Sequence, residues 1–517
     1  MTTISAPAAT LPDHRDHFGR VLRSEFTKFR TVPGWTIGMA IAGLLMVALG
    51  VLTGVGSTSS YSPGPGEPDV VGHPFIPIGP DGLPVTDEFS FAHRTLSGDG
   101  SITVRLDSLR GGRTSPDHGS EPAAVEPWAK AGLIIKDGLD QGDGYAAIMA
   151  TGAHGIRLQH DFTGDIAGPP VTTMPVWLRL TRTGDTVTGE SSTDGVTWTT
   201  TGTVPVALGN DVEAGLFATS PTAPTVTQSL GGGGSVTVNA TASITAGFDS
   251  VTITGGWAGG PWAGSAVGSD PQVLSSNGFQ QDAGRLTITG SGDIAPNTGL
   301  ASGAAERVLI GGFGTLIVTA ILAVLFITTE YRRGLMLTTL SATPRRGTVL
   351  AAKALVVGVL TFAVALAAGG LTLPIGRALL VANGNFVVPT STWTDVRVVA
   401  GTALVLALTA LLALAIGTIM RRSAAAVLVV VLVVVLPYLL ATAAVLPAGP
   451  SDWLLRLTPA AAFAVQQTSV AYPQVDGAYT PAFGYFPLGA AGGLLVLVLW
   501  TGAAMTTAAV LLRRRAA

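Results

Sequence analysis

The chain has 517 residues, of which 47% are hydrophobic and 12% are charged, and its formal net charge is −3 at pH 7. It contains no cysteine, which excludes a disulfide-stabilised scaffold. The basic clusters coincide with the ends of long apolar runs, so we expect no nucleic-acid partner.

The N-terminal segment, residues 1–35, is basic and is expected to lie in the cytoplasm. Between Asp16 and Pro33 apolar residues recur at helical spacing on one face, while arginines and a lysine occupy the other. This pattern predicts an amphipathic helix in the inner membrane interface, whereas the alternative is an ordinary positively charged flank. The apolar face of this interface helix includes Phe18, Leu22, Phe26 and Phe29.

Six long apolar runs follow, and each has the length of about 20 residues that a helix needs to cross a bilayer. They predict a six-helix α-helical transmembrane bundle. The runs are Thr36–Val55, Val308–Thr328, Ala354–Ile375, Val398–Met420, Ala424–Leu446 and Leu488–Leu512.

Lys and Arg indicate the orientation of these helices, because cytoplasmic flanks carry the excess of both. Outside residues 56–305 there are 19 basic residues, and 15 of them fall in the N-terminal segment, residues 329–353, residues 421–423 or the C-terminal tail. We therefore expect both termini to be cytoplasmic and residues 56–305 to be extracytoplasmic. A cleaved signal peptide is the alternative for the first run.

The extracytoplasmic part opens with a stalk rich in Pro and Gly, residues 56–85, and continues as a predicted domain over residues 86–305. Short alternating runs separated by turn residues predict an all-β antiparallel sandwich of jelly-roll type. The clearest signal is Val176–Trp198, where Gly184-Asp185 and Asp194-Gly195 predict tight turns. Gly231–Ser235 is predicted to be a linker.

This hairpin, together with WAKAGLIIK at 128–136 and GFDSVTIT at 247–254, resembles the concanavalin-A-like lectin/glucanase jelly rolls. The resemblance implies a domain that binds a glycan of the cell envelope. Trp177 and Trp198 are the candidate residues for stacking on a sugar ring, although most tryptophans of such a domain are expected to be core.

Two other site types are not expected in this domain. Asp137, Asp140 and Asp143 do not match a calcium loop, because Leu139 occupies a position that needs an oxygen donor. Acidic residues form no recognisable pair for glycoside hydrolysis, so we expect no catalytic residues, no metal and no enzyme. The glutamates available are Glu121, Glu126, Glu190 and Glu213.

The chain is predicted to bind no nucleotide or other cofactor itself. A phosphate-binding loop needs a glycine-rich turn that ends in Lys followed by Ser or Thr, and none of the four lysines has that neighbour. The six predicted spans also contain no charged residue or His that would couple transport to an ion. Energy for transport is therefore expected from another subunit.

Arg-Ser-Glu-Phe-Thr-Lys-Phe-Arg-Thr at 23–31 resembles the N-terminal motif of type-2 ABC transporter permeases. EYRRG at 330–334 and TTLSATPRRGTVLAAKAL at 338–355 resemble the cytoplasmic loop of that family, and WLLRLTPAAAFAVQQ at 453–467 resembles its outer segment. The resemblance implies a permease subunit of an exporter that pairs with a second permease copy and with a separate ATP-binding cassette subunit. The implied contacts with the ATP-binding subunit, in a coupling loop at 329–353, are Glu330, Arg332, Arg333, Arg345 and Arg346.

A membrane-anchored surface receptor or sensor that uses the lectin-like domain is the alternative. Few lysines beside many Arg, Ala, Gly and Val residues are typical of a GC-rich bacterial genome, so the expected location is a bacterial plasma membrane. The sequence does not indicate which cargo is transported.

Overall fold

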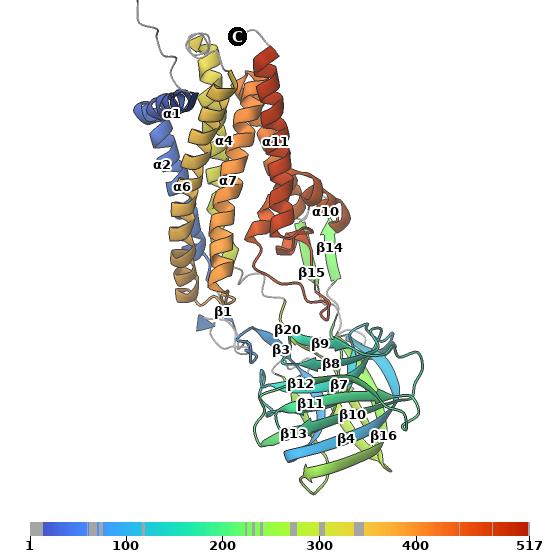
Figure 1. The fold of residues 1–517 in the computed structure, drawn as a ribbon. Coiled ribbons are helices and arrows are strands. Elements are labelled where there is room, and N and C mark those ends of the chain that lie inside the picture. Colours follow the sequence, from blue (N-terminus) through green and yellow to red (C-terminus); the bar gives the residue numbers. More distant parts are fainter. Residues whose placement is uncertain are drawn as a thin grey trace, which may run out of the picture.

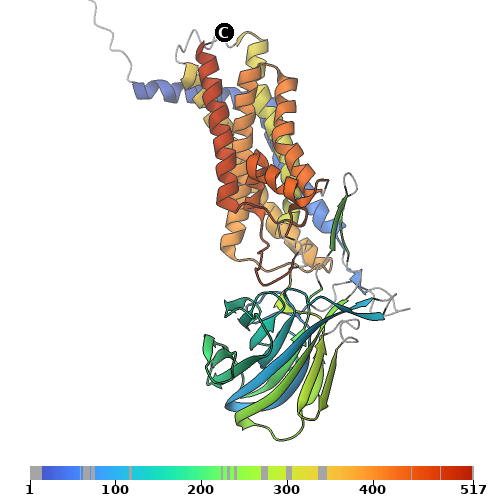
Figure 2. The same ribbon diagram turned by 90° about the vertical axis from the view of Figure 1, so that its right-hand side faces the viewer.

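The structure is a computed structural model in which a helical bundle and a β body lie end to end (Figures 1 and 2). It describes residues 14–58, 60–61, 70–71, 76–115, 119–222, 225–229, 233–237, 241–268, 277–298, 305–335, 346–443, 445–477 and 479–514.

The bundle contains six helices that are long and apolar enough to cross a membrane, counted within the described residues. Most of these helices begin before or end after the corresponding predicted run. Their bounds are α2 (Pro33–Gly56), α4 (Gly311–Arg332, preceded by the 3-10 turn η2, Ala305–Ile310), α6 (Arg346–Ala382), α7 (Thr392–Met420), the continuous α8 (Ser423–Val430), η3 (Val431–Val435, a π-helical turn) and α9 (Leu436–Thr442), and α11 (Ala490–Arg514).

Small residues let these helices approach closely. Gly311 of α4 lies against the backbone of Met46 in α2, where a β-carbon would come within 2.4 Å of the Met46 carbonyl oxygen. One turn further along, the Thr315 hydroxyl donates a hydrogen bond to the Ala42 carbonyl oxygen at 2.7 Å. Helices that are apolar on all sides associate through close backbone packing and interhelical hydrogen bonds.

Between α9 and α11 the chain forms two further elements, α10 (Ala448–Leu457) and the 3-10 helix η4 (Pro459–Gln466), within the segment predicted as an outer connection. Residues Pro459–Val465 of η4 are all buried. A β-carbon on Gly493 of α11 would approach the Ala461 carbonyl oxygen to 2.1 Å, and one on Gly401 of α7 would meet Val465 at the same distance. η4 therefore packs between α7 and α11, and it fits there because Gly401 and Gly493 have no side chain.

The β body is a large antiparallel sheet that curls until it is nearly barrel-shaped (Figures 1 and 2). Its central path runs β12-β11-β10-β4-β13-β6-β7-β8-β9, and β5, β16, β17, β18 and β19 branch from it. Strand bounds are β3 (Val85–Asp87), β4 (Phe89–Ser115), β5 (Gly119–Ala123), β6 (Lys130–Lys136), β7 (Tyr145–Thr151), β8 (Ile156–His160), β9 (Gly164–Ala167), β10 (Val176–Thr183), β11 (Thr186–Ser192), β12 (Thr199–Pro205), β13 (Asp211–Thr219), β14 (Thr225–Ser229), β15 (Gly233–Thr237), β16 (Thr241–Trp257), β17 (Ala263–Val267), β18 (Gly278–Asp282), β19 (Arg285–Gly290) and β20 (Ile294–Pro296).

The predicted antiparallel β organisation is confirmed. Along β10, Leu178 and Leu180 are buried in the main core while the residues between them are half-buried. β6 and β7 are buried on both faces, because a second apolar cluster that includes Tyr145, Phe162 and Phe217 covers the face opposite the main core.

Two details of the prediction differ from the structure. The β10–β11 connection is the expected two-residue turn, with Gly184 at φ +57°, but β11 and β12 are joined by the longer loop 193–198. This loop is stabilised by the Asp194 side chain rather than by a two-residue turn. Gly231–Ser235 was expected to be a linker, yet residues from Gly233 onward belong to β15, which pairs with β14. Part of the stalk, including residues 62–69, lies outside the described residues.

Asp194 gives a pH-dependent prediction for the β body. Its carboxylate accepts backbone N–H bonds from Thr197 and Val196 and a bond from the Ser192 hydroxyl, and these hold its pKa well below the ordinary value. Because the folded pKa is depressed, this contribution to stability is present above the unfolded pKa of about 3.9 and is lost as pH falls through the folded pKa.

Asp194→Asn should therefore lower the stability of the β body at pH 7 and flatten the loss of stability between about pH 4 and pH 2. Chemical unfolding of the full chain, followed by tryptophan fluorescence at several pH values, measures both effects. Asp185→Asn, in the exposed β10–β11 turn, is the matched control. Parallel pH curves for Asp194→Asn and the wild type would contradict the assignment.

The two bodies touch where the segment before α11 reaches the β body. The Gln474 side-chain amide donates to the Thr163 carbonyl oxygen at 3.2 Å. A cavity of about 190 Å³ beside this contact is lined by Leu83 and Pro296 of the β body and by Thr390 and Tyr472 of the bundle. The β body is thus held by side-chain contacts as well as by the two chain connections.

Candidate functional site

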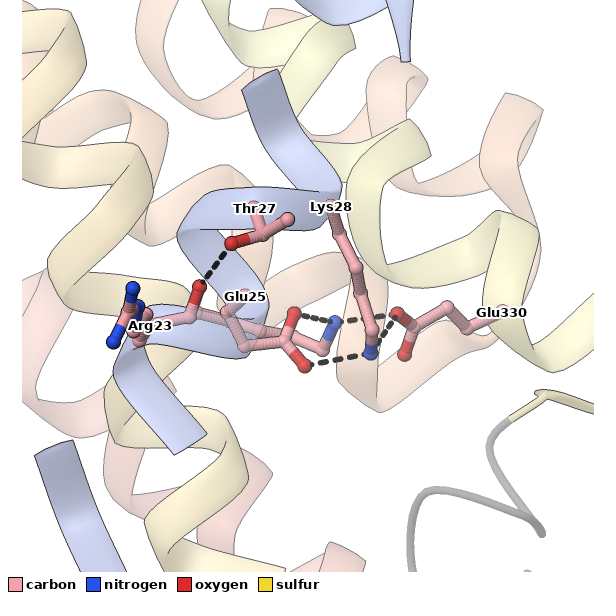
Figure 3. Close-up of polar contacts among 6 residues, drawn as sticks. Arg23, Glu25, Thr27, Lys28 and Glu330 are labelled. Carbon is pink, nitrogen blue, oxygen red and sulfur yellow. Dashed lines mark hydrogen bonds and ion pairs between the residues drawn. The ribbon is translucent and has the colours of Figure 1, made fainter. Parts of the chain in front are cut away.

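Four charged side chains from three helices meet at the end of the bundle that is remote from the β body (Figures 1 and 3). We call them the basal ion cluster: Glu25 and Lys28 of α1 (His14–Thr31), Glu330 of α4 and Lys353 of α6. The Lys353 amine lies 2.7 Å from a carboxylate oxygen of Glu25 and 2.7 Å from one of Glu330. Lys28 lies 2.8 Å from Glu25 and 3.3 Å from Glu330. Two cations therefore face two carboxylates, and the cluster is neutral.

Burial makes this cluster unusual for charged groups. The Lys353 side chain is 0% exposed and that of Glu25 is 1% exposed. Charged residues are rarely buried this deeply unless they are paired, because removing them from water costs several kcal/mol per ion in real proteins. Lys28 is more exposed. Burial acts to lower its pKa, but the hydrogen bonds and charges of Glu25 and Glu330 together outweigh burial and raise the pKa.

An aromatic floor lies beneath the cluster. The Lys353 amine is 4.6 Å from the centroid of the Phe326 ring, which is packed edge-on against Phe29 at 5.6 Å and Trp35 at 5.7 Å. These rings exclude water from one side of the ions, which strengthens the attraction between them and also the penalty for breaking it.

The sequence contained a signal for this cluster that the prediction missed. Leu22, Glu25 and Phe29 are spaced three and four apart, so Glu25 falls on the apolar face of the predicted interface helix. A carboxylate that is buried with an apolar face needs a cation as its partner. In the structure that partner is Lys353. Nothing in the sequence showed that residues 328 positions apart would meet.

The structure gives the predicted coupling-loop residues different surroundings. Glu330 is 7% exposed, so its carboxylate faces the cluster rather than solvent. Arg332 and Arg333 are exposed at the end of α4. Arg346, the first residue of α6, is half-buried and donates to the Leu512 carbonyl oxygen of α11 at 2.9 Å. Arg345 lies outside the described residues.

The predicted interface helix is present as α1, which lies across the end of the bundle (Figure 2). Phe29 is 3% exposed and belongs to the bundle core, and Leu22 packs against that core. Phe18 is 38% and Phe26 is 44% exposed. Only part of the predicted apolar face therefore packs on protein, and two phenylalanines remain open to the surroundings.

A second feature is a cavity of about 630 Å³ in the bundle, at the level of η4. Its lining includes five aromatic residues, of which Phe313, Tyr438 and Phe463 form a contiguous group with ring centroids 4.5–4.8 Å apart. Polar groups at the cavity include Gln466, whose amide donates to Thr402, and Arg307. The cavity suits a ligand that is mainly apolar and carries a small polar group.

Both candidate sugar-stacking residues, Trp177 and Trp198, have intramolecular neighbours against their rings. The Arg179 guanidinium lies 3.7 Å from the centroid of the Trp198 ring. Gly195 lies so close to Trp177 that a β-carbon there would meet the indole at 2.8 Å. Each tryptophan is half-buried, so one portion of each ring remains accessible.

Five of the acidic residues considered for calcium and for catalysis have protein partners. Asp137 accepts from the Gly209 backbone N–H at 2.5 Å, and Asp143 accepts from the Asp140 N–H at 3.2 Å. Glu190 pairs with Arg179 and Glu126 pairs with Arg113. Glu213 is bound by a histidine, His93, which the sequence did not single out.

Comparison with known proteins gives only distant likenesses. No protein-family model and no curated protein matches the chain. Solved structures that resemble part of it include a GH43 protein from Bacillus licheniformis (14% identity, TM-score 0.18, 23% of this chain and 24% of that one) and a functionally unknown protein from Saccharomyces cerevisiae (13%, 0.20, 35% and 82%). A third is SCP-B, a member of the eqolisin family of peptidases (8%, 0.23, 39% and 98%).

These likenesses correct one prediction. The sequence led us to expect that the chain is not an enzyme, but a GH43 protein and a peptidase stand among its structural neighbours. That prediction is wrong on this comparison. The chain spans about a quarter of the length of the GH43 protein, and TM-scores of 0.18–0.23 transfer no reaction to it. What the structure shows is a bundle of six long apolar helices that carries a large antiparallel β body.

Proposed function

We propose that this protein is the permease subunit of an ABC exporter, and that a separate ATP-binding subunit powers it. The observation that carries the proposal is the basal ion cluster. It joins α1, the end of α4 and the start of α6, and α4 and α6 flank the segment 336–345, whose sequence resembles the coupling loop of type-2 ABC permeases.

The cluster supplies a mechanical reason for this assignment. Two short ion pairs hold the two ends of the loop and the interface helix together as one unit. A force applied to the loop by a partner subunit would therefore move α4, α6 and α1 jointly instead of bending one of them. Exposed Arg332 and Arg333 would meet the partner, while buried Glu330 would transmit the movement.

Membrane insertion is part of the proposal. The six long helices, the exposed Phe18 and Phe26 on α1, and the arginines at the end of the bundle remote from the β body all fit a bilayer with that end in the cytoplasm. The cavity of about 630 Å³ would then lie in the outer half of the membrane and would accept a mainly apolar cargo. A second copy of the chain would complete the pathway.

The β body is proposed to be an extracytoplasmic, concanavalin-A-like jelly roll. Its curled antiparallel sheet supports this inference, and the accessible portions of Trp177 and Trp198 support contact with envelope glycan. In the alternative function, a surface receptor or sensor, the contact between Gln474 and Thr163 would transmit binding from the β body to the bundle.

Purification of the chain in detergent from its native membrane, followed by identification of the proteins that purify with it, tests the proposal. We expect a complex that hydrolyses ATP, and we expect the double variant Arg332→Glu/Arg333→Glu to abolish stimulation of ATPase activity by the permease without changing the amount of inserted protein. Arg345→Glu/Arg346→Glu should have the same effect on coupling.

Arg514→Glu, an exposed arginine at the end of α11, is the control and should leave coupling unchanged. A protein that purifies with no ATP-hydrolysing subunit, or a double variant that couples normally, would contradict the permease assignment. The first of these outcomes would favour the receptor or sensor.

A further inference from the structure

Three side chains of the β body form a continuous hydrogen-bonded chain that the proposed transport function does not use. His93 Nδ1 lies 2.5 Å from a carboxylate oxygen of Glu213, and His93 Nε2 lies 2.9 Å from the hydroxyl of Ser265. The other Glu213 oxygen accepts a bond from the Thr95 hydroxyl at 3.0 Å. Serine, histidine and carboxylate in this order are the parts of a nucleophilic hydrolase site.

Strand register brings these residues together on one face of the sheet. β4 is flanked by β17 on one side and β13 on the other, with Ser265 opposite Phe91 and Glu213 opposite Thr95. Phe91, His93 and Thr95 alternate by two along β4, so their side chains share a face, and Ser265 and Glu213 extend that face on both sides.

For a neutral His93 ring, the two hydrogen-bond partners assign the tautomer. An ionised Glu213 can only accept, so the Nδ1 atom carries the proton and donates it. In the neutral ring Nε2 then has a free lone pair that points at the Ser265 hydroxyl, which is the state required of a general base. Stacking of the ring on Phe91, with centroids 4.8 Å apart, limits its rotation.

Ser265 is more exposed than His93, as a nucleophile that must contact a substrate needs to be. His93 is 7% exposed, whereas Ser265 is half-buried and so keeps part of its surface accessible. Among the described strands β17 pairs only with β4, so its other edge has no strand partner there.

We infer that Ser265, His93 and Glu213 form a hydrolytic site for carboxylic esters. Ser265 Oγ forms a bond to the carbonyl carbon while its proton passes to His93 Nε2 and the carbonyl π electrons move to oxygen. Collapse of this intermediate re-forms the C=O bond and breaks the bond to the alcohol oxygen, which takes the proton from Nε2. Water repeats the sequence on the acyl-serine, and a carboxylic acid leaves while Ser265 regains its proton. Glu213, oriented by Thr95, is a positioning residue that stabilises the transient imidazolium.

The test uses the purified full-length protein with a fluorophosphonate probe and with p-nitrophenyl acetate. We expect the probe to attach at Ser265, as located by mass spectrometry, and Ser265→Ala to lose both labelling and ester hydrolysis. His93→Gln should reduce hydrolysis about 10²–10⁴-fold, the range of a general base. Glu213→Gln should lower kcat and leave KM unchanged.

Ser101→Ala is the matched control, because Ser101 lies on β4, the strand that also carries His93, and its hydroxyl shares a hydrogen bond with that of Thr254 at 2.7 Å. It should retain full labelling. Unfolding curves that match the wild type must accompany each variant, and Ser265→Thr gives a second nucleophile variant if Ser265→Ala does not fold. Folded wild-type protein that the probe leaves unmodified at Ser265, or hydrolysis unchanged in Ser265→Ala, would overturn the proposal.

Discussion

Lys353→Met is expected to lower the free energy of unfolding by about 3–5 kcal/mol, the cost of removing one partner from a buried ion pair. Lys353 is 0% exposed and bonds both Glu25 and Glu330 at 2.7 Å. Without its amine, two carboxylates in a largely dry site would share only Lys28. Denaturant or thermal unfolding in detergent, followed by tryptophan fluorescence, measures the change.

Two further variants separate the charge effect from simple loss of packing. Lys28→Met should cost clearly less, because the Lys28 side chain is 39% exposed and water can replace it. Glu25→Gln combined with Lys353→Met removes one charge of each sign, so the double variant should be more stable than Lys353→Met alone. A Lys353→Met protein as stable as the wild type would show that the cluster contributes nothing to the bundle.

Gly493→Ala is expected to destabilise the bundle by about 1–3 kcal/mol, the usual cost of overpacking a tight core. The new methyl group would lie 2.1 Å from the Ala461 carbonyl oxygen, which belongs to backbone and cannot rotate away. Either η4 or α11 would have to shift, and η4 lines the aromatic cavity through Phe463. Thermal stability of the purified protein measures the effect.

The neighbouring glycine is an unusually close control. A β-carbon on Gly492 would make its nearest contact with Leu488 at 3.6 Å, which is ordinary packing. Gly492→Ala should therefore be neutral or slightly stabilising, by up to about 1 kcal/mol, since alanine is the better helix former. If the two substitutions changed stability equally, the close packing of η4 against α11 at Gly493 would be contradicted.

Local sequence patterns predicted many of the helices and strands but few of the residues in the candidate sites. Alternation in Val176–Arg182 and long apolar runs each report on one strand or helix, and the structure has those elements. Neither candidate site could be assembled at that level, although Glu25 on the apolar face of the predicted helix was a local signal for the first. Glu25 and Lys353 come from helices separated by the whole β body, and His93, Glu213 and Ser265 come from strands whose pairing depends on the order of the sheet.

By itself the sequence determined the division of this protein into long apolar helices and an antiparallel β insertion, because periodicity and run length act within one segment. Only the tertiary structure decided which charges are buried together, which serine a histidine faces, and which of two adjacent glycines is indispensable to packing. These depend on distances between segments remote along the chain, and such distances are fixed when helices and strands pack, not by the residues beside them.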